Sequence, residues 1–284
     1  QRTPPVDVPL GVLPDELPLQ FELDDGKIDG ESVYYQEIYI AKVMFYDGIY
    51  SAQEYKEKVL EVLGELIRAE IAENTVAEYL NSMMAKRNKN VLMIAEESTA
   101  WPNVTGEIGT DSLGFTFKWN MGWMHDFCEY MKLDPYFRKN NHYAMTFAMS
   151  YNESENYILP LSHDEVVHLK CSMVNKMPGY TWDKFANLKA GYAYMFGHSG
   201  KKLLFMGQDF GQEREWSEER ELDWYLLGEK LNLGLHHFVR DLLKLYKKYP
   251  CMYERDQSWE GFEWMNADDA DHSTYSFVRK SKSG

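Results

Sequence analysis

Three carboxylates in this sequence each follow a short apolar segment, and this arrangement could do chemistry. Glu96 follows Val91–Ala95, Asp164 follows Tyr157–Ser162, and Asp209 follows the segment that ends at Met206. If the apolar segments are parallel strands, their carboxyl ends open on one side and the acids converge. Converging carboxylates suit glycoside chemistry, in which one acid protonates the leaving oxygen and another attacks or stabilises the anomeric carbon. A strand-end aspartate can equally be a simple turn former.

Two further features bear on what chemistry these residues could do. His163 and His168 lie five residues apart and begin at a strand end, whereas zincin ligands lie four apart on one helical face, so the sequence argues against zinc. Aromatic residues make up 15% of the chain. They could form a ring-rich core or a surface that stacks on sugars, and composition leaves both readings open.

The elements that must position these acids alternate between strand and helix. Beta-prone or apolar segments occur at 33–46, 91–95, 113–119, 157–162 and 203–206. Helical spacing follows Ser51, which forms a capping box with Glu54, and a second box follows at Thr75. Helices are also predicted after 119, over 182–196 and over 235–249. Strands that alternate with helices predict a parallel α/β sheet or barrel.

The two ends of the chain differ from its middle. Residues 1–32 contain five of the ten prolines and predict an extended arm. Residues 273–278 form one more beta segment close to Gly284, which resembles the beginning of a further domain.

Charge and composition exclude several classes of protein. The net charge is −15, which disfavours nucleic acids and anionic membranes as partners. No apolar run approaches the ~18 residues of a membrane span. The three cysteines are widely spaced and suit reduced thiols, so we expect a cytoplasmic protein.

Several longer motifs resemble those of one family, the bacterial 1,4-α-glucan (glycogen) branching enzymes of the α-amylase superfamily. They are IAEEST at 94–99, LGF at 113–115, KWNMGWMHD at 118–126, LPLSHDEVVH at 159–168, KKLLFMG at 201–207 and LDW at 222–224. The resemblance runs from about residue 74 to the end of the chain. It implies the C-terminal half of a (β/α)8 barrel, partial or rearranged, followed by the start of an all-β domain.

The resemblance also implies roles for single residues. Glu96 matches the general acid/base, Asp164 matches the carboxylate that stabilises the transition state, and His163 matches a histidine that binds substrate hydroxyls. Trp119 and Trp123 could line glucan subsites or pack in the core. The family needs no metal and no organic cofactor. Glu97 is expected to point elsewhere or to hydrogen-bond its own loop.

The sequence departs from the family pattern in several places. The family's nucleophile is an aspartate two residues after an arginine, and this chain contains no Arg-x-Asp triplet. Asp47 is the nearest candidate for the nucleophile position, but Phe45 stands in place of the arginine. Leu169 replaces a usual glycine and Asp209 a usual glutamate.

The predicted organisation has four parts. They are a Pro-rich arm at 1–32, an atypical N-terminal part of the catalytic domain at 33–72, the C-terminal half of the barrel at 73–265, and the beginning of a β-domain at 266–284. The implied function is transfer of α-1,4-glucan segments to 6-hydroxyls of glycogen or amylose. The alternatives are a glucan-binding remnant without turnover and an α-glucan hydrolase. A half barrel would need self-association or a complementing chain to cover its open sheet.

Overall fold

The computed structural model describes residues 44, 48–99, 101–108, 110 and 112–283, with no description of the side chains at 63–76. The chain divides into two units, Gln1–Tyr79 and Leu80–Gly284. The predicted Pro-rich arm lies outside the described residues.

The first long helix is α2 (Ala52–Arg87). The predicted capping box at its start is present, because the Ser51 backbone N–H donates to Glu54 Oε2 at 2.8 Å and the Glu54 N–H donates to Ser51 Oγ at 3.3 Å. The second helix start predicted at Thr75 is wrong, since α2 runs through it without a break. A capping sequence inside a continuous helix has no free N–H groups to cap.

Four parallel strands form one sheet in the order β1-β2-β3-β4. Their bounds are β1 (Ile94–Ala95), β2 (Phe117–Trp119), β3 (Tyr157–Leu161) and β4 (Lys201–Leu204). The first two are shorter than the sequence predicted. Just before β1, the Met93 N–H donates to the Thr116 hydroxyl at 3.1 Å rather than to a backbone carbonyl, which makes the ladder irregular there.

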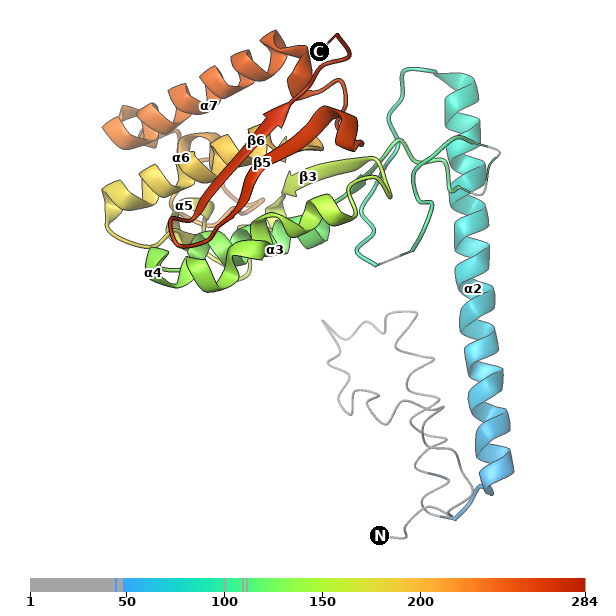
Figure 1. The fold of residues 1–284 in the computed structure, drawn as a ribbon. Coiled ribbons are helices and arrows are strands. Elements are labelled where there is room, and N and C mark those ends of the chain that lie inside the picture. The colour runs from blue at the N-terminus through green and yellow to red at the C-terminus, as the bar shows by residue number, and fades with distance from the viewer. Residues whose placement is uncertain (1–43, 45–47, 100, 109, 111, 284) are drawn as a thin grey trace. The chain divides into compact units, whose positions relative to one another are not determined.

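Three helices alternate with these strands, as the sequence predicted (Figure 1). They are α3 (Met121–Lys132), α6 (Thr181–Gly197) and α7 (Lys230–Lys248). The buried cluster beneath the sheet joins Trp123 and Phe127 of α3 to Leu159 and Leu161 of β3 and to Tyr192 of α6. Alternate residues of β3 therefore face the helices, and this packing fixes one face of the sheet.

Shorter helices occupy the connections. They are α4 (Pro135–Arg138), η2 (Lys139–Met145), η3 (Phe147–Ser150), η4 (His163–Glu165), α5 (Met173–Lys176), η5 (Gln208–Phe210), η6 (Trp224–Gly228), η7 (Pro250–Met252) and η8 (Trp259–Gly261).

The chain ends in an antiparallel hairpin of β5 (Phe262–Asp269) and β6 (Thr274–Arg279), drawn in red in Figure 1. Tyr275 stacks on His142 with ring centroids 4.2 Å apart. Arg279 forms a 2.6 Å ion pair with Asp256, and both side chains are buried. The hairpin is thus attached to the helical layer of the same unit, and β5 spans the predicted boundary at 265/266.

The described elements make a mixed α/β fold with one parallel and one antiparallel sheet. Within the described part of the chain the parallel sheet has four strands and does not close into a barrel. None of the described helices combines the length and apolar character that a membrane span requires.

Candidate active site

The turn that follows β3 holds Asp164 in a fixed hydrogen-bonding frame. Ser162 Oγ donates to Asp164 Oδ2 at 2.8 Å, and the Asp164 backbone N–H donates back to Ser162 Oγ at 3.3 Å. His163 Nε2 lies 3.3 Å from Asp164 Oδ1. The Ser162 side chain is buried, whereas about a third of the Asp164 side chain and 44% of the His163 side chain are exposed. The turn therefore presents one carboxylate and one imidazole to solvent from a rigid base.

The loop around Trp216 braces this turn from the other side. The Trp216 N–H donates to Val166 O at 2.9 Å, and its ring lies edge-on to the His163 ring at 6.2 Å. Phe205 at the end of β4 contacts the same imidazole, with centroids 5.9 Å apart. Two aromatic rings thus flank the imidazole, whose side chain keeps 44% of its surface exposed.

Glu165, the third residue of this turn, is buried and pairs with two lysines. Its carboxylate oxygens lie 3.4 Å from Lys170 Nζ and 3.4 Å from Lys176 Nζ. These contacts join the buried Glu165 carboxylate to Lys170 and Lys176, in the segment that follows the turn.

Glu96 and Glu97 follow β1 and have different surroundings. Glu96 is exposed. Glu97 accepts from Lys118 Nζ at 2.5 Å and from the Thr99 N–H at 2.6 Å. Burial by itself raises the pKa of Glu97, but these hydrogen bonds outweigh it and hold that pKa below its ordinary value. The expectation that Glu97 hydrogen-bonds its own loop is confirmed.

The sheet brings Glu96 and Asp164 to the same edge, at the carboxyl ends of β1 and β3. The register pairs Ala95 with Lys118 and Lys118 with Tyr157, so Glu96 is level with Ile158. Asp164 lies further along, in the turn beyond the end of β3. This stagger is expected where parallel strands are inclined to a common axis.

The other residues singled out from the sequence have varied surroundings. Trp123 is 1% exposed and stacks on Phe127 at 4.9 Å, so the structure corrects its assignment to a glucan subsite: the ring is part of the core. Trp119 is half-buried and lines a cavity. Asp209 accepts from His236 Nδ1 at 2.9 Å and so links η5 to α7. Asp47 lies outside the described residues.

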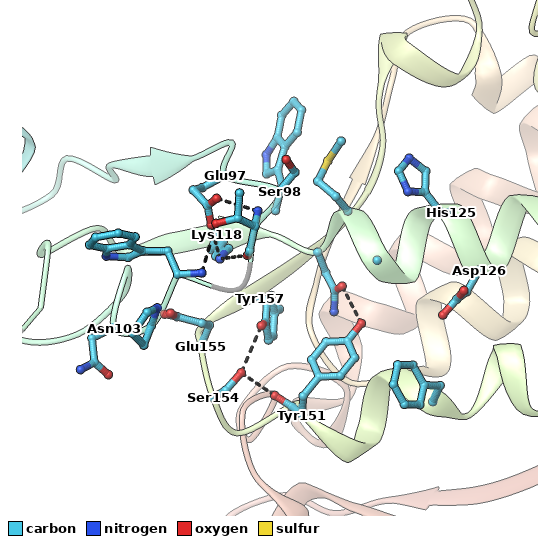
Figure 2. A pocket seen from close by; sticks show the side chains of 18 residues that line it. Glu97, Ser98, Asn103, Lys118, His125, Asp126, Tyr151, Ser154, Glu155 and Tyr157 are labelled. Carbon is cyan, nitrogen blue, oxygen red and sulfur yellow. Dashed lines mark hydrogen bonds and ion pairs between the residues drawn. The ribbon is translucent and has the colours of Figure 1, made fainter. Parts of the chain in front are cut away.

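The cavity that Trp119 lines has a volume of about 740 Å³ (Figure 2). Glu96, His163 and Asp164 do not line it. Its polar residues include Lys118, Asp126 and Glu155, which sequence reasoning did not single out as functional. Among all the described residues, those of the cavity included, no group of three or more His, Cys, Asp or Glu side chains could hold a metal ion.

Comparison with known proteins places the sequence motifs in a wider context. No family model matches the chain. The 1,4-alpha-glucan branching enzyme GlgB of Butyrivibrio fibrisolvens is 70% identical over 207 residues, which cover 73% of this chain and 32% of that protein. The resemblance to the branching enzymes is confirmed. The proteins of the same name from Nitrobacter winogradskyi and Pseudomonas fluorescens are 54% and 50% identical over 70% and 72% of this chain.

The chain spans about a third of the length of these branching enzymes: 32% of the Butyrivibrio protein and 28% of each of the other two. A solved structure of an α-amylase from H.orenii has a TM-score of 0.47 and 13% sequence identity, and covers 75% of this chain and 50% of that chain. That likeness is too low to carry a conclusion.

One departure from the branching-enzyme pattern has a visible backbone consequence. Leu169, which replaces a usual glycine, has φ +65° and is 95% exposed. Its backbone N–H donates to Glu215 Oε2 at 3.1 Å, and the Cys171 N–H donates to Glu215 Oε1 at 2.7 Å. The Glu215 carboxylate thus holds a left-handed loop in a conformation that disfavours leucine.

Proposed function

We propose that this chain is part of a 1,4-α-glucan branching enzyme, which transfers an α-1,4-glucan segment to a 6-hydroxyl with retention. One observation carries the proposal: 70% identity over 207 residues to a protein of that name. Any stretch of 207 residues in a chain of 284 includes both Glu96 and Asp164. The motifs that contain the two carboxylates therefore belong to the similar region.

We propose likewise that residues 73–265 form the C-terminal half of a (β/α)8 barrel. Four parallel strands in sequential order, helices packed on one face and carboxylates at one edge support this arrangement. Residues 33–72 would be an atypical N-terminal part of the domain, and 266–284 the beginning of a β-domain. The edges of a half barrel would be covered by self-association or by a complementing chain.

In the proposed mechanism, a carboxylate nucleophile attacks the anomeric carbon of the donor, and Glu96 gives its proton to the departing O4 as the C1–O4 bond breaks. Glu96 then takes the proton of an acceptor 6-hydroxyl, and O6 displaces the carboxylate from C1. Asp47 is the proposed position of the nucleophile. The exposed side of Glu96 leaves it free to reach both oxygens in turn.

Asp164 and His163 act on the donor sugar in this proposal. Asp164 binds the distorted sugar more tightly in the transition state than in the ground state, and this difference lowers the barrier. The hydrogen bonds from Ser162 fix Asp164 Oδ2 and orient the other oxygen toward His163. The His163 imidazole, held between two rings, is placed to hydrogen-bond a sugar hydroxyl. No metal or organic cofactor takes part in these steps.

The test is to incubate amylose with the purified chain and to count new α-1,6 linkages after enzymatic debranching. We expect new linkages with the unaltered chain and fewer than a hundredth as many with Glu96→Gln. A folded chain that binds maltoheptaose and forms no such linkages would contradict the proposal and favour a glucan-binding remnant. Release of reducing ends without new linkages would instead identify a hydrolase.

A further inference from the structure

Glu215 binds the 166–171 loop, which follows the turn that carries Asp164. Glu215 Oε2 accepts from the Leu169 backbone N–H at 3.1 Å, and Oε1 accepts from the Cys171 N–H at 2.7 Å. Both oxygens of one carboxylate therefore bind donors of the same short loop. Hydrogen bonds to a charged acceptor are stronger than those between neutral groups, and a two-point contact also fixes orientation. The carboxylate is thus placed to set the path of the chain at 169–171.

The loop has a backbone conformation that its own residues disfavour. His168, Leu169 and Cys171 have φ angles of +53°, +65° and +67°. The left-handed region is unfavourable for residues that carry a Cβ atom. All three residues are exposed, so their side chains gain little burial to offset this cost. Because such outliers persist only where surrounding contacts determine the backbone, contacts from outside the loop select its shape, and Glu215 supplies two of them.

The loop also returns to the residue next to Asp164. Lys170 lies between the two residues whose N–H groups Glu215 binds, and its ammonium is 3.4 Å from the buried carboxylate of Glu165. The Lys170 carbonyl accepts from Lys176 Nζ at 2.6 Å, and Lys176 lies 3.4 Å from the other Glu165 oxygen. A buried carboxylate is costly without its partners. The position of the loop therefore affects the residue that directly follows Asp164.

Trp216, the residue after Glu215, contacts the same turn by two further routes. Its N–H donates to Val166 O at 2.9 Å, and the Val166 N–H in turn donates to His163 O at 2.8 Å. The Trp216 ring lies 6.2 Å from the His163 ring and 5.2 Å from the Phe205 ring. Because the two residues are bonded neighbours, fixing Glu215 on the loop also fixes Trp216 beside His163.

We infer that Glu215 is a positioning residue, which acts through the 166–171 loop to hold the turn that carries His163 and Asp164. The importance of that turn for catalysis rests on the proposed function. Glu215 takes no part in making or breaking bonds. Its effect is to preorganise Asp164, which acts on the transition state, so it lowers the barrier without tightening substrate binding.

The experiment compares the unaltered chain with Glu215→Gln, whose amide keeps the shape of the side chain but turns an N–H group toward one of the two backbone donors. Branching of amylose is assayed over a range of substrate concentrations. We expect kcat to fall about 10- to 100-fold while KM changes less than about 2-fold. The matched control is Glu218→Gln, at an exposed glutamate of the same segment whose side chain makes no hydrogen bond or ion pair with the described residues. Its kcat should equal that of the unaltered chain.

A second measurement needs no turnover. The Val166 amide closes the turn by donating to His163 O, and its hydrogen exchange should be at least about 10-fold faster in Glu215→Gln. The amide of Leu188, a fully buried residue of α6, reports on global unfolding and should keep its rate. Equal acceleration at both amides would indicate a general loss of stability and would overturn the inference.

The double variant Glu215→Gln/Leu169→Gly tests the route through the loop. Glycine adopts the left-handed conformation without steric cost, so the loop depends less on outside contacts to keep its shape. Adding Leu169→Gly should therefore raise kcat about 2-fold or more above that of Glu215→Gln. No recovery would contradict the inference, since it would show that the loop conformation does not carry the effect.

The outcomes separate this inference from the proposed function. If the unaltered chain forms no α-1,6 linkages, the proposed function fails and the exchange rates decide: selective acceleration at Val166 upholds the hold on the turn, and an unchanged rate overturns it. If linkages form, an unchanged kcat in Glu215→Gln overturns the inference and leaves the proposed function intact. A raised KM with an unchanged kcat would do the same, because it would place Glu215 in substrate binding.

Discussion

The carboxyl ends of β3 and β1 carry the two proposed catalytic acids but differ in how firmly the protein holds them. All five residues of β3 are buried, and the strand has a partner on each side. β1 has two residues, pairs with β2, and exposes 44% of Ile94. Asp164 is fixed by Ser162 and His163, whereas Glu96 is exposed.

This difference separates two requirements of an active site. A group that stabilises charge in the transition state must be preorganised, and the β3 end provides that. A group that moves a proton between two oxygens must reach both, and an exposed side chain on a short strand can do so. Stability and activity should therefore respond differently to substitutions at the carboxyl ends of β1 and β3.

The largest expected effect is on activity. Glu96→Gln should lower branching by about 10²–10⁴-fold without changing the free energy of unfolding, because the side chain is exposed. Asp164→Asn should lower branching by a similar factor and also destabilise the fold by about 1 kcal/mol, through its weakened bond to Ser162. Linkage assays and urea denaturation measure the two quantities. Equal stability losses in both variants would remove the distinction between the strand ends.

The next effect compares two tryptophans, Trp123 of α3 in the core and Trp119 of β2 beside the cavity. Trp123→Ala should cost about 3–5 kcal/mol of unfolding free energy, because its ring fills the core beneath β3. Trp119 lies in β2, the strand that pairs with β1, and is half-buried. Trp119→Ala should therefore lower the free energy of unfolding by less than half as much. Denaturant titration of both variants gives the comparison. A smaller loss for Trp123 than for Trp119 would contradict the core assignment.

The sequence predicted the β3 side of the molecule better than the β1 side. The helical period after Asn120 and over 182–196 reflects side chains that are buried together, so local pattern and tertiary packing agree. The apolar segment 91–95 predicted five strand residues, and two are paired as a strand. Edge strands depend on a partner's register, which a local pattern does not encode.

The candidate site divides in the same way. The strand-end positions of Glu96 and Asp164 follow from the alternation of strands and helices along the chain. Glu97 stood out because it repeats the glutamate before it, and Leu169 because it replaces the family's usual glycine. The cavity around Asp126 and Phe147 was not predicted, because it exists where a connecting helix is missing. The only signal in the sequence was the long connection between two strands without helical periodicity.

The pH dependence of stability tests a buried histidine on the β4 side of the sheet. His198 is buried at the end of α6, and burial lowers its pKa from 6.5 to about 3. The unfolded chain therefore binds a proton below pH 6.5 that the folded chain does not bind until about pH 3, so stability is lost as the pH falls.

Between pH 7 and pH 5 this single group should lower the free energy of unfolding by about 2 kcal/mol. His198→Gln should remove that part of the pH dependence, whatever its effect on stability at pH 7. Leu169→Ala, which replaces an exposed side chain that does not titrate, is the matched control and should keep the pH profile of the unaltered chain. A profile that is identical in His198→Gln and the unaltered chain would contradict the buried neutral imidazole.

The smallest effect concerns two left-handed residues, one in the loop after each strand end. Leu169 has φ +65° and Asn103 has φ +57°. Leucine pays about 1–2 kcal/mol for this conformation, whereas asparagine tolerates it. A new glycine removes the strain but adds about 0.4–1 kcal/mol of unfolded-state entropy. Leu169→Gly should therefore stabilise the fold by about 0.5–1 kcal/mol, and Asn103→Gly should leave it unchanged or slightly weaker. Leu169→Ala keeps the left-handed strain, so this variant should show no gain in stability when thermal denaturation is measured. A gain equal to that of Leu169→Gly would contradict the argument. It would show that the cost comes from the exposed leucine side chain and not from its backbone conformation.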